Sequence, residues 1–415
     1  MIKHILKIIW NQRRSNGWIF AELLIVAGFL WVMIDTFYVD MVTYRSPLGY
    51  DITNVWRFKL TEEGRTDTLP GLSEPEKLTR LIEQIRQNPE VYEVCATFYS
   101  CPYSFGNSWR SITPLDGDSS ISSAQSFQIR NVTPEYFRLF NVQNSDGKPV
   151  YDEVSGVRNA LVVSREMADM FYPGKQARGR KVRYDSKEEV FTIASVSSSI
   201  RANEYERPEP CFFQCLNGEI YNLVVEDFGA RDAELCVRMK RSLSRDDMNL
   251  FLDSMGDRLT ADNLMVYGIT PMQEFRDIQL SGKERDMSNK FSLMLFMLIN
   301  VFFGIIGTFW LRMQNRRGEI GLRMVLGAHR ITLQQYMYAE GLCLLAFSLP
   351  LVLLFGVNLL MTDYIDTYRQ SLSVARVLVT LGATYLLMGG MIILGIWFPV
   401  RQAVRMAPAD ALHYE

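Results

Sequence analysis

The sequence predicts a membrane protein with four transmembrane α-helices and a large α+β domain of two lobes, inserted between the first and the second helix. Four apolar stretches, at 19–38, 291–311, 339–361 and 377–398, hold 20 to 23 residues each. About 20 apolar residues are enough for an α-helix to cross a bilayer. The roughly 250 residues between the first two stretches are enough for one or two folded subdomains.

Basic residues near the apolar stretches predict their orientation. Lys and Arg are concentrated before the first stretch and between the second and third, and cytoplasmic segments of membrane proteins are enriched in them. Both chain ends are therefore expected in the cytoplasm. The predicted segments are a cytoplasmic interfacial helix at 1–18, transmembrane helix 1 at 19–38, an extracytoplasmic domain at 39–289, transmembrane helix 2 at 290–312, a cytoplasmic loop at 313–338, transmembrane helix 3 at 339–361, an outer loop at 362–376, transmembrane helix 4 at 377–398 and a cytoplasmic tail at 399–415.

The first 18 residues place Ile5, Leu6, Ile9 and Trp10 on one helical face, which is typical of a helix lying in the membrane surface. A frayed basic tail is the alternative. The span that follows is longer than the core of about 7 to 15 apolar residues in a signal peptide, and no small-residue cleavage site follows it. We therefore interpret it as an uncleaved anchor.

The outer domain shows alternating helix and strand signals in two groups. A capping-box pattern with an early proline opens a helix at Ser73, and alternating or β-branched runs predict the strands. The first group comprises a helix from 73 to 88, strands at 91–99, 127–132, 160–163 and 190–196, a helix after Thr133-Pro134 and a helix from Ser164 to Phe171. The second comprises strands at 220–225, 235–239 and 264–269, a helix at 244–259 and a helix from Thr270-Pro271 toward the second span.

Charge and histidine content exclude several functions. With 44 basic and 46 acidic residues, the chain lacks the basic character of a nucleic-acid-binding protein. Its three histidines, His4, His329 and His413, all fall in predicted cytoplasmic segments. The outer domain therefore contains no base for a Ser-His-Asp or Cys-His hydrolase and no imidazole ligand for zinc. No residues are assigned to catalysis or to a metal.

Five cysteines fall in the outer domain, at 95, 101, 211, 215 and 236, and Cys343 falls in the third span. Cys211 and Cys215 would be about 13 Å apart on one strand, too far for a disulfide. Any disulfide is therefore expected to join distant segments. Burial of the cysteines as small apolar residues remains an equal alternative, and a thiolate metal site is the weakest.

Two carboxylates interrupt the first span and are candidates for an intramembrane polar site. Glu22 and Asp35 would each be costly to bury in lipid, which favours a function. Each also lies about one turn from an end of the span, where its carboxylate reaches interfacial water. Gly304, Gly307, Gly389 and Gly390 are expected to permit close helix packing, including packing across a dimer.

Several segments of the chain resemble a known family. The segments 127–137, 160–173, 179–182 and 191–196 resemble, in order and spacing, the extracytoplasmic core domain of MacB-type ABC transporter permeases. The segment 316–328 is similar to the cytoplasmic loop of the FtsX-like permease domain, with Glu340 in the matching register after it. The end of the chain is similar to that domain's closing motif through Pro399, Ala403, Pro408, Ala411, Leu412 and Glu415, although His413 stands where the family usually has Arg.

The resemblance implies that the cytoplasmic loop contains a coupling helix that docks into an ATPase subunit. Glu319 and Arg323 are spaced i, i+4, and apolar residues between them suit a partner groove. The expected coupling residues are Arg316, Arg317, Glu319, Ile320, Gly321, Leu322, Arg323, Leu326, Gly327 and Ala328. An amphipathic loop lying on the membrane is the alternative.

The expected function is that of the permease subunit of an ABC transporter in the bacterial inner membrane, which exports or extrudes a peptide, drug or lipoprotein-type substrate by mechanotransmission. The chain contains no Gly-x4-Gly-Lys-Ser/Thr loop, so ATP and Mg are expected in a separate ATPase subunit. The other expected partners are a second permease, as a homodimer or heterodimer, a periplasmic adaptor or outer-membrane channel, and membrane lipid. The alternative is a signalling permease that transports nothing and controls a cell-wall hydrolase or a sensor kinase.

Overall fold

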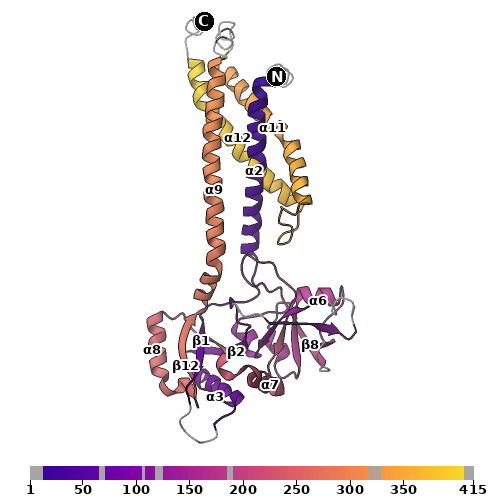
Figure 1. The fold of residues 1–415 in the computed structure, drawn as a ribbon, viewed down its shortest axis with the longest axis vertical. Coiled ribbons are helices and arrows are strands. Elements are labelled where there is room, and N and C mark those ends of the chain that lie inside the picture. Colours follow the sequence, from indigo (N-terminus) through magenta and orange to yellow (C-terminus); the bar gives the residue numbers. More distant parts are fainter. Residues whose placement is uncertain are drawn as a thin grey trace. The chain divides into compact units, whose positions relative to one another are not determined.

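The computed structural model describes residues 13–64, 71–104, 108–116, 125–184, 190–315, 318, 322 and 329–405. The chain divides into two compact units (Figure 1). Unit 1 comprises Met1–Arg45 and Lys283–Glu415, and unit 2 comprises Ser46–Gly282. Of the predicted interfacial helix at 1–18, residues 1–12 lie outside the described ranges, and residues 13–18 are the first turns of the long helix through span 1.

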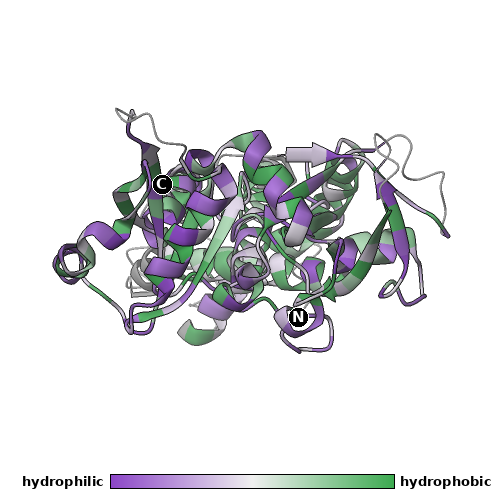
Figure 2. Ribbon diagram, turned by 90° about the horizontal axis from the view of Figure 1, so that it is seen from below, coloured by the Kyte–Doolittle hydropathy of each residue, from purple (hydrophilic) through white to green (hydrophobic). Residues whose placement is uncertain are grey.

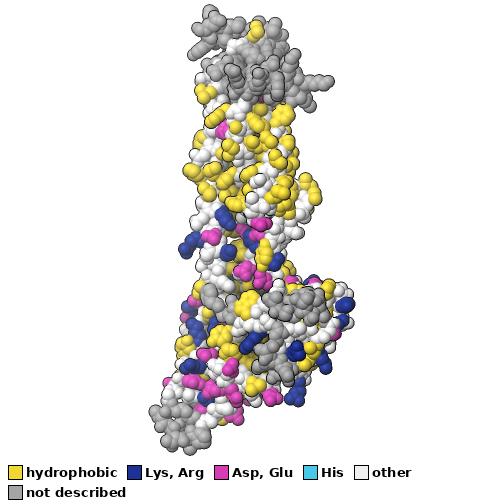
Figure 3. Space-filling model, turned by 45° about the vertical axis from the view of Figure 1, so that its right-hand side comes forward, with side chains coloured by type: hydrophobic (Ala, Val, Ile, Leu, Met, Phe, Trp, Pro, Cys, Tyr) yellow, Lys and Arg dark blue, Asp and Glu magenta, His cyan; other side chains and the backbone are white. Residues whose placement is uncertain are grey.

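Among its described residues, unit 1 contains four helices that are each long and apolar enough to cross a membrane. They are α2 (Arg13–Arg45), α9 (Met272–Asn315), α11 (Arg330–Met361) and α12 (Val374–Arg405). Helix α9 begins in unit 2, so the helix predicted from Thr270-Pro271 and the predicted second span are one continuous helix. On the face that Figure 3 shows, hydrophobic side chains dominate the middle of the helical part, with few charged ones among them. The structure therefore confirms the prediction of four membrane-length helices with a large domain inserted in the chain between the first and the second of them.

The helices α2, α11 and α12 contact one another and enclose a shared apolar core. Trp31 of α2 lies at its centre, 4% exposed, and its indole N–H donates to Thr380 of α12 at 2.9 Å. On the α11 side, Gly356 allows the close approach, since a Cβ there would lie 2.4 Å from the Trp31 ring. In contrast, almost none of the apolar segment of α9 is buried within a single copy of the protein.

The described residues of unit 2 form one 12-stranded sheet in the order β11-β12-β1-β10-β2-β5-β9-β6-β8-β7-β4, with β3 paired to β5. The strands are β1 (Val55–Glu62), β2 (Val91–Phe98), β3 (Ser108–Arg110), β4 (Ile112–Pro114), β5 (Phe127–Val132), β6 (Ala160–Ser164), β7 (Lys181–Tyr184), β8 (Val190–Ser197), β9 (Cys211–Cys215), β10 (Glu234–Met239), β11 (Thr260–Ala261) and β12 (Leu264–Pro271). The two predicted lobes are the two parts of this sheet. Strands β2 and β5 join them through only two residue pairs, Thr97 with Val132 and Phe98 with Asn131.

The helices of unit 2 are short and cover the sheet with apolar faces, while their other faces are hydrophilic (Figure 2). They are α3 (Glu74–Arg86), α4 (Glu135–Leu139), α5 (Tyr151–Val154), α6 (Arg165–Phe171), α7 (Gly218–Phe228) and α8 (Arg245–Met255), with 3₁₀ turns η1 (Ala230–Asp232) and η2 (Gly256–Leu259). The predicted capping box of α3 is present between Ser73 and Glu76. Ser164 caps α6 as predicted by accepting from the Met167 amide at 3.3 Å.

Two sequence predictions for unit 2 are wrong. The segment 220–225 is part of helix α7 and not a strand, because Ile220, Tyr221, Val224 and Val225 recur at helical spacing toward the core. The lobes also do not follow chain order. Strand β2, from the first predicted group, pairs with β10 from the second, so the chain starts in one half of the sheet, crosses to the other and returns.

A candidate functional site at one end of the helical unit

Charged side chains are buried at the end of unit 1 where α2 and α11 finish and α12 begins. Asp35 of α2 is 5% exposed, and Arg376 in the first turn of α12 is 1% exposed. The connection between α11 and α12, residues 362–373, lies against them and contributes Asp366 and Arg369. A buried charge is tolerated only when it is paired and hydrogen-bonded, so the partners of each group decide whether this end is stable.

Asp35 and Arg376 form a bidentate ion pair between α2 and α12. The Nε and Nη2 atoms of Arg376 donate to the two carboxylate oxygens of Asp35 at 2.8 and 2.5 Å. The remaining Nη1 atom donates to the backbone carbonyls of Asp366 at 2.9 Å and Gln370 at 2.6 Å. Every nitrogen of the guanidinium group is therefore satisfied, as such a buried pair requires. The pair fixes α2, α12 and the connecting loop to one another.

A second ion pair ties the same loop to α2 one turn further along. Arg369 donates from Nη1 to Asp40 at 2.6 Å and from Nε to Asp366 at 2.5 Å. The carboxylate of Asp366 also accepts from the Arg369 amide at 2.9 Å. Burial raises the pKa of Asp366, but the hydrogen bonds from Arg369 outweigh it and hold that pKa below its ordinary value. Arg369 thus bridges a carboxylate of the loop and a carboxylate of α2.

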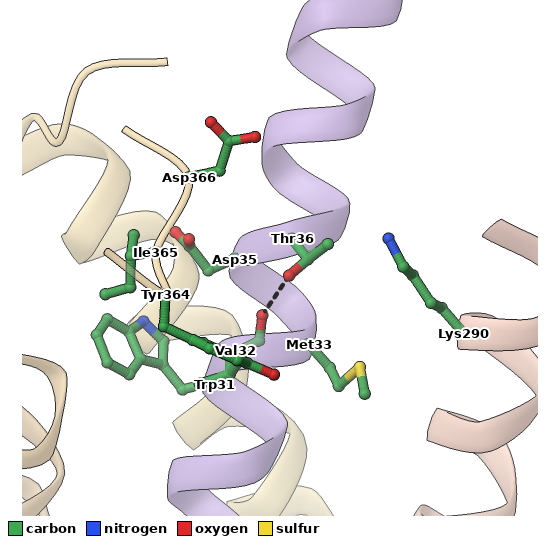
Figure 4. A pocket seen from close by; sticks show the side chains of 9 residues that line it. All are labelled: Trp31, Val32, Met33, Asp35, Thr36, Lys290, Tyr364, Ile365 and Asp366. Atoms are coloured by element: carbon green, nitrogen blue, oxygen red, sulfur yellow. Dashed lines mark hydrogen bonds between the residues drawn. The ribbon is translucent and has the colours of Figure 1, made fainter. Parts of the chain in front are cut away.

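A cavity of about 260 Å³ opens beside the first pair (Figure 4). Its lining combines apolar side chains with five that carry a charged group or a hydroxyl. The residues are Trp31, Val32, Met33, Asp35 and Thr36 from α2, Lys290 from α9, and Tyr364, Ile365 and Asp366 from the loop. In Figure 4 Lys290 lies on the opposite side of α2 from the loop, and the Thr36 hydroxyl donates to the Val32 carbonyl at 2.9 Å. Such a cavity suits a small amphipathic group.

A larger and almost wholly apolar cavity of about 530 Å³ lies between α2 and α11. Its lining residues are Leu24, Ile25, Gly28, Phe29, Val32, Met33, Leu351, Val352, Phe355, Leu359 and Tyr364. Gly28 keeps the space open on the α2 side, because a Cβ there would contact the Phe355 ring at 3.4 Å. An acyl chain matches this lining, since it offers no polar group that would need a partner.

The two carboxylates predicted in span 1 lie in different environments. The structure places Asp35 in the ion pair described above, and it places Glu22 against α9, where a Cβ on Gly304 would be 2.5 Å from the Glu22 Oε1 atom. The close atom at Gly304 is therefore the end of the Glu22 side chain, and a Cβ on Gly389 would make ordinary contact with Leu342 at 3.6 Å. Nothing lies within 4 Å of a Cβ on Gly307 or Gly390 in one copy of the described chain.

Most predicted coupling residues, namely Arg316, Arg317, Glu319, Ile320, Gly321, Arg323, Leu326, Gly327 and Ala328, lie outside the described residues. Leu322, which is described, is 53% exposed. Glu340, predicted in register after this loop, is 3% exposed in α11. Within the described ranges, no group of three or more His, Cys, Asp or Glu side chains is arranged to hold a metal ion.

Sequence reasoning missed Arg376 and Arg369 as the partners of α2. The available signal was the composition of the loop between the third and fourth apolar stretches, which carries Arg369 and Arg376 near Asp363 and Asp366. A charge at the end of one span and an opposite charge in another are expected to pair in a membrane. Which arginine meets which aspartate depends on helix rotation, and the sequence does not specify that.

Part of the chain is similar to known permeases. Residues 291–408 match the family model described as FtsX-like permease C-terminal. A curated relative, the macrolide export ATP-binding/permease protein MacB of Burkholderia pseudomallei, is 29% identical over 114 residues, which are 26% of this chain and 16% of the relative. The alignment thus spans about one sixth of the relative's length.

Two solved structures are also similar to this chain at low identity. The periplasmic region of MacB from Actinobacillus actinomycetemcomitans is 12% identical with a TM-score of 0.34, covering 55% of this chain and 94% of that structure. The extracellular domain of the ABC-type transporter YknZ from Gram-positive bacteria is 15% identical with a TM-score of 0.29, covering 51% of this chain and 100% of that structure. The fold assignment therefore rests on the helices and strands described above.

Proposed function

We propose that this chain, a multi-pass membrane protein that carries an FtsX-like permease domain, is the permease subunit of an ABC transporter in the bacterial inner membrane. The match of residues 291–408 to that domain is the observation that carries the proposal. The four membrane-length helices and the large domain inserted after the first of them support it. ATP and Mg bind a separate ATPase polypeptide, and this chain converts the ATPase motion into movement of its own helices.

The proposed coupling element is the segment 316–328 between α9 and α11. Its residues Glu319 and Arg323 are spaced to pair on one helical face, and Leu322 is exposed. Both flanking helices span the membrane, so displacement of this segment moves α9 and α11 together. The ion pairs of Asp35 and Asp40 keep α2, α12 and the loop between α11 and α12 in one rigid group against which α9 shifts.

A second permease copy is the proposed partner of α9. Apolar side chains of this helix, such as Phe296 at 62% and Phe303 at 65% exposure, are uncovered in one copy. Gly307, on the same helix, has nothing within 4 Å of a Cβ position. Small residues allow close approach of helices in membranes, which supports α9 as the dimer contact. The rest of that surface contacts lipid.

Unit 2 is proposed to lie outside the cytoplasm, with both chain ends inside. The proposed substrate class is an amphipathic or acylated molecule, a class that includes drugs and lipoproteins. The apolar cavity between α2 and α11 and the amphipathic cavity at Asp35 support this class, because together they offer space for an acyl chain and for a polar group. A periplasmic adaptor or outer-membrane channel would complete the export route.

The test is co-purification of the tagged chain from its native membrane in mild detergent, followed by identification of the bound proteins. We expect an ABC ATPase, and we expect the variant Glu319→Lys with Arg323→Glu to retain less than about one tenth of it, because charge reversal at an interface costs several kcal/mol. The matched control reverses the exposed pair Glu284 and Arg285 of α9 and keeps the ATPase.

The outcomes separate the alternatives. Absence of an ATPase in a preparation that keeps other membrane complexes intact contradicts the proposal. An ATPase that is retained equally by both charge-reversed variants contradicts the coupling role of 316–328. An ATPase accompanied by a cell-wall hydrolase or a sensor kinase, with no adaptor or channel, replaces transport by signalling.

A further inference from the structure

Three cysteines that the proposed function does not use meet in the core of unit 2. Cys95 lies on β2, Cys236 lies on the neighbouring β10, and Cys101 lies in the loop that follows β2. All three are nearly inaccessible, at 1%, 0% and 5% exposure. Cys95 and Cys236 are direct partners in the β2–β10 register. The Cys101 Sγ atom lies 3.3 Å from the Cys236 Sγ atom.

A buried carboxylate sets the position of Cys101. The Glu234 Oε2 atom accepts from the amides of Ser100 at 2.9 Å and Cys101 at 2.8 Å, and from the Thr97 hydroxyl at 2.9 Å. Its Oε1 atom lies 3.2 Å from Arg57 Nη2. Glu234 and Cys236 are two residues apart on one strand, so they point to the same face of the sheet. The loop held by Glu234 is therefore folded over the face that carries the Cys236 thiol.

We propose that Cys101 and Cys236 form a disulfide bond in the mature protein. The inference rests on the proposed function for one point, the location of unit 2 outside the cytoplasm, where disulfides form and persist. The two thiols lose two protons and two electrons, and an S–S bond forms. A thiol–disulfide oxidoreductase of that compartment takes up the electrons, and its own disulfide is reduced to two thiols.

Cys101 is a better disulfide partner for Cys236 than Cys95 is. The two sulfurs at 3.3 Å must approach to about 2.05 Å, and Cys101 lies in a loop that adjusts more easily than a strand. Cys95 and Cys236 are both fixed in the β2–β10 hydrogen-bond ladder. The other pair in unit 2, Cys211 and Cys215, are the two ends of β9 and too far apart. Four thiols therefore remain, at Cys95, Cys211, Cys215 and Cys343.

The bond would hold in place the loop that contacts the first residue of α9. Cys101 Sγ also lies 3.9 Å from the sulfur of Met272, the first residue of α9, which is fully buried. Burial and the neighbouring Cys236 thiol raise the pKa of Cys101 above its ordinary value, so this thiol is unreactive once the core has closed. The oxidation step therefore belongs to folding, before Cys101 and Cys236 are covered.

The test counts thiols in the full-length chain taken directly from membranes. The membranes are quenched in acid, and the protein is denatured without reductant, alkylated and digested for mass spectrometry. We expect a peptide pair joined through Cys101 and Cys236, with alkylation at the other four of the six cysteines. Alkylation of all six, or a bond between Cys95 and Cys236, overturns the inference.

Matched variants keep the result specific. Cys95→Ser is expected to lose only its own thiol, so that three cysteines are alkylated and the bond between Cys101 and Cys236 persists. Cys101→Ser is expected to leave all five remaining cysteines alkylated. Reduction of the wild-type protein is expected to lower its unfolding midpoint by about 5 °C or more, because the bond closes a loop of more than 100 residues. The Cys101→Ser protein is expected to show no such shift.

A reporter separates this inference from the proposed orientation. Leu250→Cys places a thiol on α8 at a position that is 68% exposed, where a membrane-impermeant maleimide labels it in intact spheroplasts if unit 2 is outside. Labelling together with six alkylated native cysteines contradicts the disulfide alone. No labelling together with six alkylated cysteines contradicts the orientation and the disulfide with it.

Discussion

Asp35 and Arg376 show how a membrane helix accommodates a charge. The sequence leaves two interpretations of Asp35, a functional group or a carboxylate that reaches interfacial water. The structure gives a third answer, because the carboxylate is 5% exposed and both its oxygens bind one arginine from another helix. A fully satisfied pair of this kind specifies which helices pack and how they are rotated.

Removing one member of this pair should be more damaging than removing both. We expect Asp35→Asn to lower the free energy of unfolding of unit 1 by about 3 kcal/mol or more, since it leaves a buried guanidinium without a counter-charge. The double variant Asp35→Leu with Arg376→Leu is expected to recover about half of that loss. The measurement is the unfolding midpoint in mixed micelles titrated with dodecyl sulfate, with Thr36→Val as a nearly neutral control.

Asp51 should make unit 2 sensitive to acid. Burial raises its pKa, but hydrogen bonds from Thr53 and Arg238 outweigh burial and hold the pKa below its ordinary value. A lowered carboxylate pKa contributes stability above the unfolded value of about 4 and loses it as the pH falls through the folded value. We expect hydrogen exchange in β1 and β10 to accelerate as the pH falls below about 4, after correction for the intrinsic rate. Asp51→Asn should show a smaller acceleration, and an unchanged one would exclude this role.

At the scale of elements, the sequence predicts a helix or a strand correctly where the hydrophobic periodicity and the residues at the ends of the segment indicate the same structure. Strand β5 was predicted with its observed bounds, and α3 with its capping box. Helix α7 was predicted in part as a strand, because its β-branched and aromatic residues favour a strand while their spacing favours a helix. Packing of the helical face against the core decides such a case.

Close packing of α2 and α11 requires the glycine at position 356. We expect Gly356→Ala to lower the free energy of unfolding of unit 1 by about 1 to 3 kcal/mol, because its Cβ would lie 2.4 Å from a ring that is held by its bond to Thr380. Gly382→Ala on α12 meets nothing within 4 Å and should be neutral or gain up to about 1 kcal/mol from helix propensity. The same dodecyl sulfate titration measures both, and equal effects would contradict the packing argument.

At the scale of the whole chain, topology follows from the spans and their flanking charges. The proposed orientation predicts opposite labelling of two equally exposed positions, Leu250 in unit 2 and Ile331 at the start of α11, each 68% exposed. A cysteine at 250 should react with an impermeant maleimide in intact spheroplasts, and one at 331 only after the membrane is opened. The reverse pattern would invert the orientation. The native cysteines of unit 2 are all buried and supply little background.

The sequence by itself determined the four spans, the inserted α+β domain, most of its strands and the absence of histidine chemistry there. These features follow from local composition and period, which a single segment displays without its neighbours. Only the tertiary structure decided that Arg376 meets Asp35, that Cys101 meets Cys236, and that both lobes share one sheet. The two side-chain pairs join residues more than 130 positions apart, and the shared sheet depends on the pairing of β2 with β5. All three are set by the rotation and register of whole elements.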